Sequence, residues 1–201
     1  MIRLQSHYFG SLFYWAAIAA NKQVVIDVHE HFEKQTYRNR VLILGPNGPQ
    51  ALVVPIQGRN KKQALGEVRI SYEESWLRVH LNSLQTAYRA APYFDHVYPE
   101  IESILLKKPE LLLDLNLELV RYFIKRLRLD AEVKLSQAYD LLPTEQEARD
   151  KFHPKKENKS VPPYPQVFQE KFGFVSGMGV IDLVMNDLSG AAAYLKKPAL
   201  Q

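Results

Sequence analysis

Residues 24–40 have the sequence VVIDVHEHFEKQTYRNR, and the interpretation of the whole chain depends on this stretch. It begins with β-branched residues typical of a strand and continues without a break into acids, imidazoles, cations and an aromatic ring. Loops that follow regular elements commonly carry binding and catalytic side chains. The stretch is therefore predicted to be the functional centre of the protein.

The composition bounds the possible functions. The chain has 201 residues, 46% of them hydrophobic and 24% charged, which is typical of a globular protein. Its formal net charge of +4 slightly favours anionic partners, but the basic residues are too dispersed for nucleic-acid binding. The chain has no cysteine, which excludes disulfides and thiolate chemistry and fits a cytoplasmic location.

The run LFYWAAIAA at residues 12–20 resembles the apolar part of a signal peptide. The polar residues at 5–7 and the aromatic content of the run argue against a signal, and the run is too short to span a bilayer. We therefore expect a buried helix here and no membrane insertion.

Hydrophobic periodicity and turn residues predict the order of elements. In the first third we expect a helix over 9–21 and strands over 23–28, 38–44, 51–56 and 67–70. The sequence GPNGP at 45–49 predicts a hairpin turn between the second and third of these strands.

The middle third is predicted to be helical over 74–90, from 96 or 99 to 107, and over 109–128, followed by a strand over 131–135. Ser71 and Glu74 form a candidate capping box for the first of these helices. The proline-rich segment 138–165 is a long loop and a candidate lid, and closing helices are expected over 180–188 and 191–197.

We therefore expect an α+β fold in which a small N-terminal mixed sheet packs against a mostly helical middle and C-terminal part. The chain is predicted to form one domain with four segments: β-rich 1–72, helical 73–137, the long loop 138–165 and the closing helices 166–201.

Asp27, His29 and His31 are spaced by two residues, which places them on one face of an extended strand about 6.5 Å apart per step. Histidine and aspartate are ligands for zinc or iron, so the three could hold a metal. They could equally form an acid–base pair in which the carboxylate orients an imidazole. The third alternative is the polar face of an edge strand.

Lys34, Arg38 and Arg40 follow directly, with Tyr37 and Asn39 between them. Several hydrogen-bond donors within a few residues suit a phosphate or carboxylate, and arginine adds bidentate geometry. The alternative is a solvated charged strand. The neighbouring tyrosine and imidazoles favour an anionic or nucleotide-like ligand.

Several motifs in the chain, in order and over nearly its whole length, resemble the WbqC-like family. They are YFGSLFY at 8–14, FEKQTYRNR at 32–40, AYRAAPYF at 87–94, YPQVF at 164–168 and KFGF at 171–174. The match is closest to the short, Bacteroidetes-type form of the family. The family pattern does not require a histidine at position 31, so no metal site is assigned and His29 is preferred.

The resemblance implies a bacterial protein of O-antigen or other surface polysaccharide biosynthesis, a family for which transfer of an amino acid onto a sugar has been proposed. On this view His29, oriented by Asp27, is the general base. Binding of a small anionic or sugar-linked substrate is assigned to Lys34, Tyr37, Arg38, Asn39 and Arg40, together with Tyr8 and His80. No cofactor is assigned.

The cleft is expected where segment 27–40 meets the helix that carries Trp76 and His80. The alternative function is a non-catalytic binding module for a sugar nucleotide or for a partner enzyme. One departure from the family is VSGMGV at 175–180, where the family usually has Leu-Pro-Asn-Leu-Ser-Ile. Its glycines are expected to loosen the start of the following helix.

Overall fold

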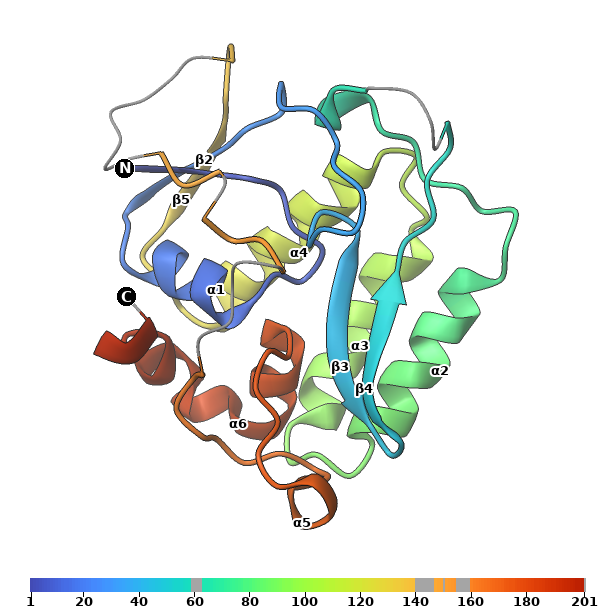
Figure 1. The fold of residues 1–201 in the computed structure, drawn as a ribbon, viewed down its shortest axis with the longest axis vertical. Coiled ribbons are helices and arrows are strands. Elements are labelled where there is room, and N and C mark those ends of the chain that lie inside the picture. The colour runs from blue at the N-terminus through green and yellow to red at the C-terminus, as the bar shows by residue number, and fades with distance from the viewer. Residues whose placement is uncertain (59–62, 140–146, 150, 155–159, 201) are drawn as a thin grey trace.

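The computed structural model describes residues 1–58, 63–139, 147–149, 151–154 and 160–200. Figure 1 shows the arrangement of the elements along the chain. The strands are β1 (Ile2–Leu4), β2 (Gln23–Ile26), β3 (Arg40–Gly45), β4 (Gly48–Val53) and β5 (Glu132–Leu135). The helices are α1 (Leu12–Ala19), α2 (Trp76–Tyr88), α3 (Phe94–Leu106), α4 (Leu112–Arg126), α5 (Gln169–Phe172) and α6 (Val180–Leu195), with short 3-10 turns at Leu65–Glu67 and Pro198–Leu200.

Within the described residues, a small parallel sheet has β2 at its centre, between β1 and β5. Parallel neighbours need a crossover connection, and α1 provides the one between β1 and β2. The chain then passes through the hairpin and the helices α2 to α4 before it returns as β5. The sequence did not predict β1, because three residues interrupted by Arg3 show no usable alternation.

Helix α1 confirms the prediction that the apolar run near the N-terminus is a buried helix. Tyr14, Trp15 and Ile18 are almost completely buried, and Ser11 caps the helix by accepting a hydrogen bond from the Tyr14 N–H at 3.3 Å. Among the described residues, no helix combines the length and apolar character needed to cross a bilayer.

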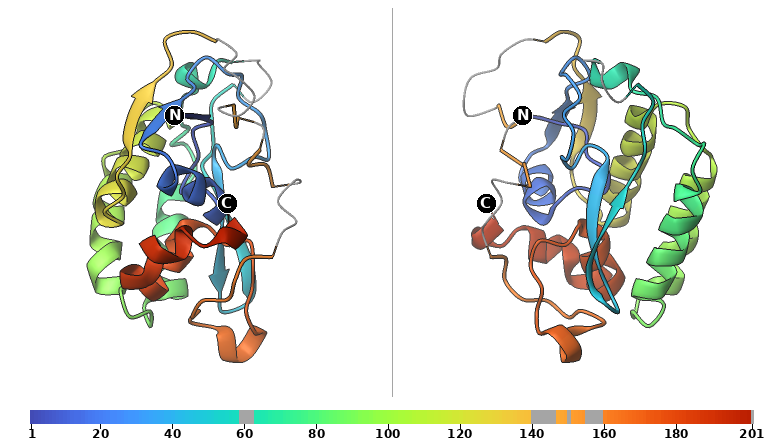
Figure 2. Two further views of the ribbon diagram at one scale, coloured as in Figure 1. Left: turned by 90° about the vertical axis from the view of Figure 1, so that its left-hand side faces the viewer. Right: turned by 45° about the vertical axis from the view of Figure 1, so that its right-hand side comes forward.

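The predicted hairpin is confirmed: β3 and β4 are antiparallel and turn at Gly45 and Gly48. Figure 2 shows the hairpin running beside α2, which contacts β3. The strand predicted at 67–70 is wrong. The 3-10 turn Leu65–Glu67 comes first, and Arg69 and Ile70 then form only isolated bridges, to Leu111 and Ile56.

The helices of the middle third match the prediction within a few residues, but the capping box is wrong. Helix α2 begins at Trp76, its N-cap is Ser75, and no side chain bonds the cap backbone. The apolar face of α2 is buried through His80, Leu84 and Tyr88. Helix α4 is the most regular of these, with apolar residues on one face and cations in its last turn.

The two predicted closing helices lie within α6, which is kinked at Asp187, where the dihedrals are non-helical, so the break falls beside the predicted one. Gly179 precedes α6 where the backbone passes close to the hairpin, since a Cβ there would lie 2.3 Å from Val41 Cγ2. The glycine at this place therefore permits close packing. The proposed lid, 138–165, lies partly outside the described residues and stays a prediction.

Near the start of α6, the buried carboxylate of Asp182 accepts hydrogen bonds from the Tyr88 and Tyr164 hydroxyls and from Gln166 Nε2, all within 2.9 Å. Burial nevertheless raises the pKa of Asp182.

One apolar core cluster includes residues from Ile2 to Leu200, so the N-terminal sheet and the closing helix share it. The α+β class is thus confirmed.

Candidate functional site

Strand β2 ends at Ile26, two residues earlier than predicted, and residues 28–30 form a bend. Asp27, His29 and His31 therefore do not share one face of a strand, and that expectation is wrong. Asp27 is completely buried, whereas His29 and His31 are exposed. Within the described part of the chain, no group of three or more histidine, aspartate or glutamate side chains is arranged to hold a metal ion.

Asp27 is held by polar partners at the carboxyl end of β2. Its Oδ1 accepts hydrogen bonds from the backbone N–H of His29 at 2.8 Å and from Ser136 Oγ at 3.1 Å, and its Oδ2 pairs with Arg149. The carboxylate thus bonds the backbone of His29 and not its imidazole. The prediction that Asp27 orients the His29 imidazole is therefore wrong.

Arg149 joins Asp27 to a second carboxylate. Its Nε and a terminal nitrogen bind both oxygens of Glu147 at 2.8 and 2.7 Å, a bidentate geometry, while the other terminal nitrogen binds Asp27. Glu147 also forms a parallel bridge with Arg3 of β1. This ion pair therefore ties the segment around 147–149 to the edge of the parallel sheet.

Arg38 lies in a second buried ion pair. Its Nε and terminal nitrogen bind the two Glu30 oxygens at 3.0 and 2.8 Å, and its remaining nitrogen donates to Thr36 Oγ1 at 3.1 Å. Burial raises the pKa of Glu30, and the hydrogen bonds from Arg38 oppose that shift. Because the Arg38 guanidinium is committed to Glu30, its predicted contact with substrate would need this pair to open.

His7 is a buried imidazole that the sequence did not single out. Its ring stacks on Tyr14 at 4.4 Å between centroids and lies 5.5 Å from Tyr37, and its Nε2 donates to Gln5 Oε1 at 3.1 Å. Burial lowers the pKa of His7, so the ring is neutral at physiological pH. Its Nδ1, like the neighbouring Ser6 hydroxyl, has no hydrogen-bond partner in the described structure.

We call these residues the sealed polar cluster: Gln5, Ser6, His7, Asp27, Glu30, Arg38, Ser136, Glu147 and Arg149. Strands β1, β2 and β5 are parallel, so their carboxyl ends meet at one edge, where ligands of parallel sheets commonly bind. The cluster contains a neutral base and three carboxylates, but its charges are paired with one another.

A pocket of about 390 Å³ lies where segment 32–40 meets the start of α2. Such a cleft between segment 27–40 and the Trp76 helix is what the sequence led us to expect. We call it the α2 pocket. Its polar lining comes from Lys34, Gln35, Asn39, Arg40 and Glu74, and its apolar wall from Phe32, Trp76 and residues 53–56.

The cations of the α2 pocket differ from Arg38 in their surroundings. Lys34 is exposed and Arg40 is half-buried, and the Arg40 guanidinium has no ion-pair or hydrogen-bond partner among the described residues. Asn39 lines the pocket, but its amide nitrogen donates to the Val54 carbonyl at 2.8 Å and thereby fixes the pocket wall. An anion in the pocket would therefore meet the Arg40 guanidinium first.

Tyr8 and His80 lie behind the pocket wall. The Tyr8 hydroxyl and His80 Nδ1 are 3.0 Å apart and hydrogen-bonded, and the His80 ring packs edge-on against Trp76 at 4.9 Å. Burial lowers the pKa of His80 to about 4, with a hydrogen bond to the Val53 backbone opposing the shift. Both residues are buried, so they position Trp76 and do not face the pocket directly.

The predicted site residues thus fall into separate places. Lys34, Asn39 and Arg40 meet in the α2 pocket. The buried residues Asp27, Tyr37 and Arg38 belong to the region of the sealed polar cluster, Tyr8 and His80 lie behind Trp76, and His29 is exposed on the bend. Sequence reasoning missed His7, Ser136 and Arg149. Recognising β1 would have flagged His7, because it follows the end of a parallel strand, as Asp27 and Ser136 do.

A family model described as the WbqC-like protein family matches residues 5–151. That range includes both the sealed polar cluster and the α2 pocket. No curated protein and no solved structure matches the chain.

Proposed function

The chain belongs to the WbqC-like protein family, and from this premise we propose that it is a cytoplasmic transferase of surface polysaccharide biosynthesis. In this proposal it moves an aminoacyl or acyl group from an anionic donor onto a sugar. The observation that carries the proposal is the α2 pocket, whose lining includes the cations Lys34 and Arg40 and the ring of Trp76. Cations beside an aromatic wall suit a ligand that joins phosphate or carboxylate to a ring.

The residues that line or support the α2 pocket have different roles in this proposal. Arg40 and Lys34 neutralise the donor and stabilise charge that develops on the leaving group. Trp76 supplies an apolar face for a sugar or base, and its own N–H is occupied by the Ser71 carbonyl at 2.8 Å. The Tyr8–His80 pair keeps that ring in place from behind.

His29 is the proposed general base. It removes a proton from the acceptor amine or hydroxyl as that atom attacks the donor carbonyl carbon, and the donor's anionic group leaves. In support, its ring is exposed and its backbone is fixed by the carboxylate of Asp27. It lies three residues before Phe32, which lines the α2 pocket.

The alternative, a non-catalytic binding module, has its own supporting observation. Asp27 is sealed by Arg149 and Ser136, and His29 is not among the residues that line the α2 pocket. In this case the pocket would hold a sugar nucleotide and present it to a partner enzyme.

Calorimetric titration with sugar nucleotides, amino acids and acyl donors tests the binding half of the proposal. We expect at least one of them to bind and Arg40→Gln to weaken that binding about tenfold, the effect of losing about 1.4 kcal/mol. Arg78→Gln is the matched control, because Arg78 is an exposed arginine on the same helix as Trp76 and lies outside the pocket. Equal losses in both variants, or no binding by the native protein, would contradict the pocket.

His29→Gln tests the catalytic half. With an identified donor and acceptor, this variant should bind the donor as before but lose turnover, because the amide cannot accept the proton at neutral pH. Turnover at the native rate would eliminate His29 as the base. Donor binding without turnover by the native protein, with any acceptor sugar, would favour the binding module.

A further inference from the structure

A second pocket, of about 1010 Å³, lies between α3, α4 and α6. We call it the α4 pocket. Its lining shares no residue with the α2 pocket, and it is formed largely by the C-terminal half of α4 together with residues of α3 and α6. Its volume is near the upper end of the range of about 300–1,000 Å³ that small-molecule sites occupy.

Unpaired positive charge is the main feature of the α4 pocket. Arg121, Lys125, Arg126 and Arg128 line it, and in the described part of the chain none of these four forms an ion pair. The lining carboxylates are Glu100 and Glu118, of which Glu118 is already paired with Lys107. The balance in the pocket is therefore positive.

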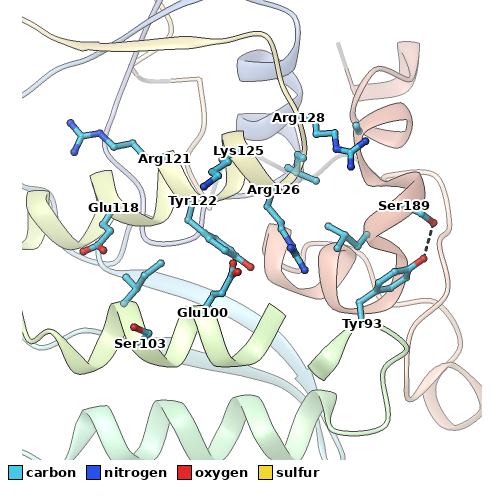
Figure 3. Close-up of a pocket in the computed structure, with 14 residues that line it drawn as sticks. Tyr93, Glu100, Ser103, Glu118, Arg121, Tyr122, Lys125, Arg126, Arg128 and Ser189 are labelled. Atoms are coloured by element: carbon cyan, nitrogen blue, oxygen red, sulfur yellow. Dashed lines mark hydrogen bonds between the residues drawn. The ribbon is translucent and has the colours of Figure 1, made fainter. Parts of the chain in front are cut away.

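Figure 3 shows how these side chains lie. The Arg126 guanidinium and the Glu100 carboxylate lie on the side of the Tyr122 hydroxyl, while Arg121 and Arg128 extend away from this group on opposite sides. Arg126 donates to the His96 carbonyl at 2.6 Å, but its Nε–H is buried and has no acceptor among the described residues. A buried donor on a charged group that lacks an acceptor is destabilising, so an acceptor at this place would stabilise the protein.

Arg128 has an unusual backbone conformation and lines the α4 pocket. It follows the C-cap Leu127 with φ +52°, a left-handed conformation that glycine adopts far more readily than other residues. Lys108 adopts the same conformation after α3 without lining the pocket, so the conformation alone does not mark a site. What Arg128 adds is a further cation in the lining of the α4 pocket.

Cations at the end of α4 would also be expected on structural grounds alone, because they interact favourably with the helix dipole. That effect is modest, is screened by salt and falls off within the last turn. It accounts for Lys125 and Arg126, but it does not require an arginine at 128.

We infer that the α4 pocket binds a phosphate-bearing ligand with at least two negative charges. Lys125, Arg126 and Arg128 would contact the phosphates by charge-assisted hydrogen bonds. The hydroxyls of Ser103 and Tyr93, the latter hydrogen-bonded to Ser189 at 2.8 Å, supply polar groups for an attached sugar. The ligand is either a free phosphate ester or the headgroup of a phospholipid, and this site does not depend on the function proposed for the α2 pocket.

The test compares two double variants that lose the same charge. Lys125→Gln with Arg128→Gly removes two pocket cations whose side chains have no described hydrogen bond, and it places glycine at a position with positive φ. Arg78→Gln with Lys108→Gly is the matched control, because Lys108 follows α3 with φ +49° and neither residue lines the pocket. Thermal melting checks that both variants fold, and neither should melt below the native protein.

Inorganic pyrophosphate is the soluble probe, measured by calorimetry. Vesicles of phosphatidylcholine with and without phosphatidic acid are the membrane probe, measured by co-sedimentation. The pocket variant should bind pyrophosphate at least about tenfold more weakly than the native protein, while the control binds as the native protein does. Additional binding to phosphatidic acid vesicles, lost in the pocket variant, would identify a lipid headgroup.

Pyrophosphate binding without vesicle binding would identify a free phosphate ester as the ligand. Three results would overturn the inference: no binding of either probe by the native protein, native affinity in the pocket variant, or an equal loss in the control.

Discussion

The sealed polar cluster and the α2 pocket lie in the same part of the chain but use their charges in opposite ways. In the cluster, Arg149 binds Asp27 and Glu147, and Arg38 binds Glu30. In the pocket, Arg40 has no such partner in the described structure. Paired buried charges fix the backbone, whereas an unpaired charge at a pocket wall remains available to a ligand.

The largest effect on stability is expected from a substitution of Arg149, which pairs with two carboxylates. Arg149→Met should destabilise the protein by about 3–5 kcal/mol, because it leaves the Asp27 carboxylate buried and uncompensated. Urea unfolding measures the change. Adding Asp27→Asn to Arg149→Met should restore part of the lost stability, because the neutral amide removes the buried negative charge. A loss below about 1 kcal/mol in Arg149→Met would mean that the cluster does not fix the fold.

His80 should make stability depend on pH. Its pKa is about 4 in the folded protein, against 6.5 for an unperturbed histidine, so the unfolded chain takes up the proton first as the pH falls. This group should therefore cost about 2 kcal/mol of stability between pH 7 and pH 5. His80→Gln should show a correspondingly flatter profile in urea unfolding at the two pH values. Parallel profiles would show that His80 is not held neutral behind Trp76.

In contrast to Arg149→Met, Arg40→Gln should weaken ligand binding and leave the free energy of unfolding nearly unchanged. We expect stability within about 0.5 kcal/mol of the native protein, because the guanidinium makes no hydrogen bond or ion pair with the described residues. The titration described above should nevertheless show weaker ligand binding. A large loss of stability in urea would place Arg40 with the structural cations and remove the contrast between the two regions.

The smallest effect is expected at an exposed ion pair. Lys22 and Asp130 are 3.4 Å apart, and both side chains are about 85% exposed. Lys22→Gln should change the free energy of unfolding by less than about 0.5 kcal/mol, because water and salt screen such a pair. A cost near that of Arg149→Met would show that burial does not set the value of ion pairs in this protein.

Local signals predicted much of the fold. The glycines and prolines at 45–49 identified the hairpin, and periodic apolar residues identified α2 and α4 within a few residues. The strand β1 was missed because three residues give no pattern, and the parallel sheet was missed with it. Strand partners such as β2 and β5 are separated by about a hundred residues, and that pairing leaves no local trace in the sequence.

For the candidate site, the sequence indicated the position of a pocket but not the long-range ion pairs. The α2 pocket lies where segment 32–40 meets Trp76, as the sequence led us to expect. The ion pairs of Arg38 and Arg149 were not foreseen. The partner of Asp27 lies 122 residues away, and the bend after Ile26 separates Asp27 from His29 in a way that alternation cannot reveal.

The contacts of Asp182 also determine where the chain can be cut. The family match ends at residue 151, but the first two turns of α6 are buried against the rest of the core. A fragment ending at 151 would leave the Tyr88 hydroxyl without its carboxylate acceptor and would uncover the apolar surface that α6 occupies. Such a fragment is expected to aggregate on expression, so the family match is not a safe boundary for recombinant work.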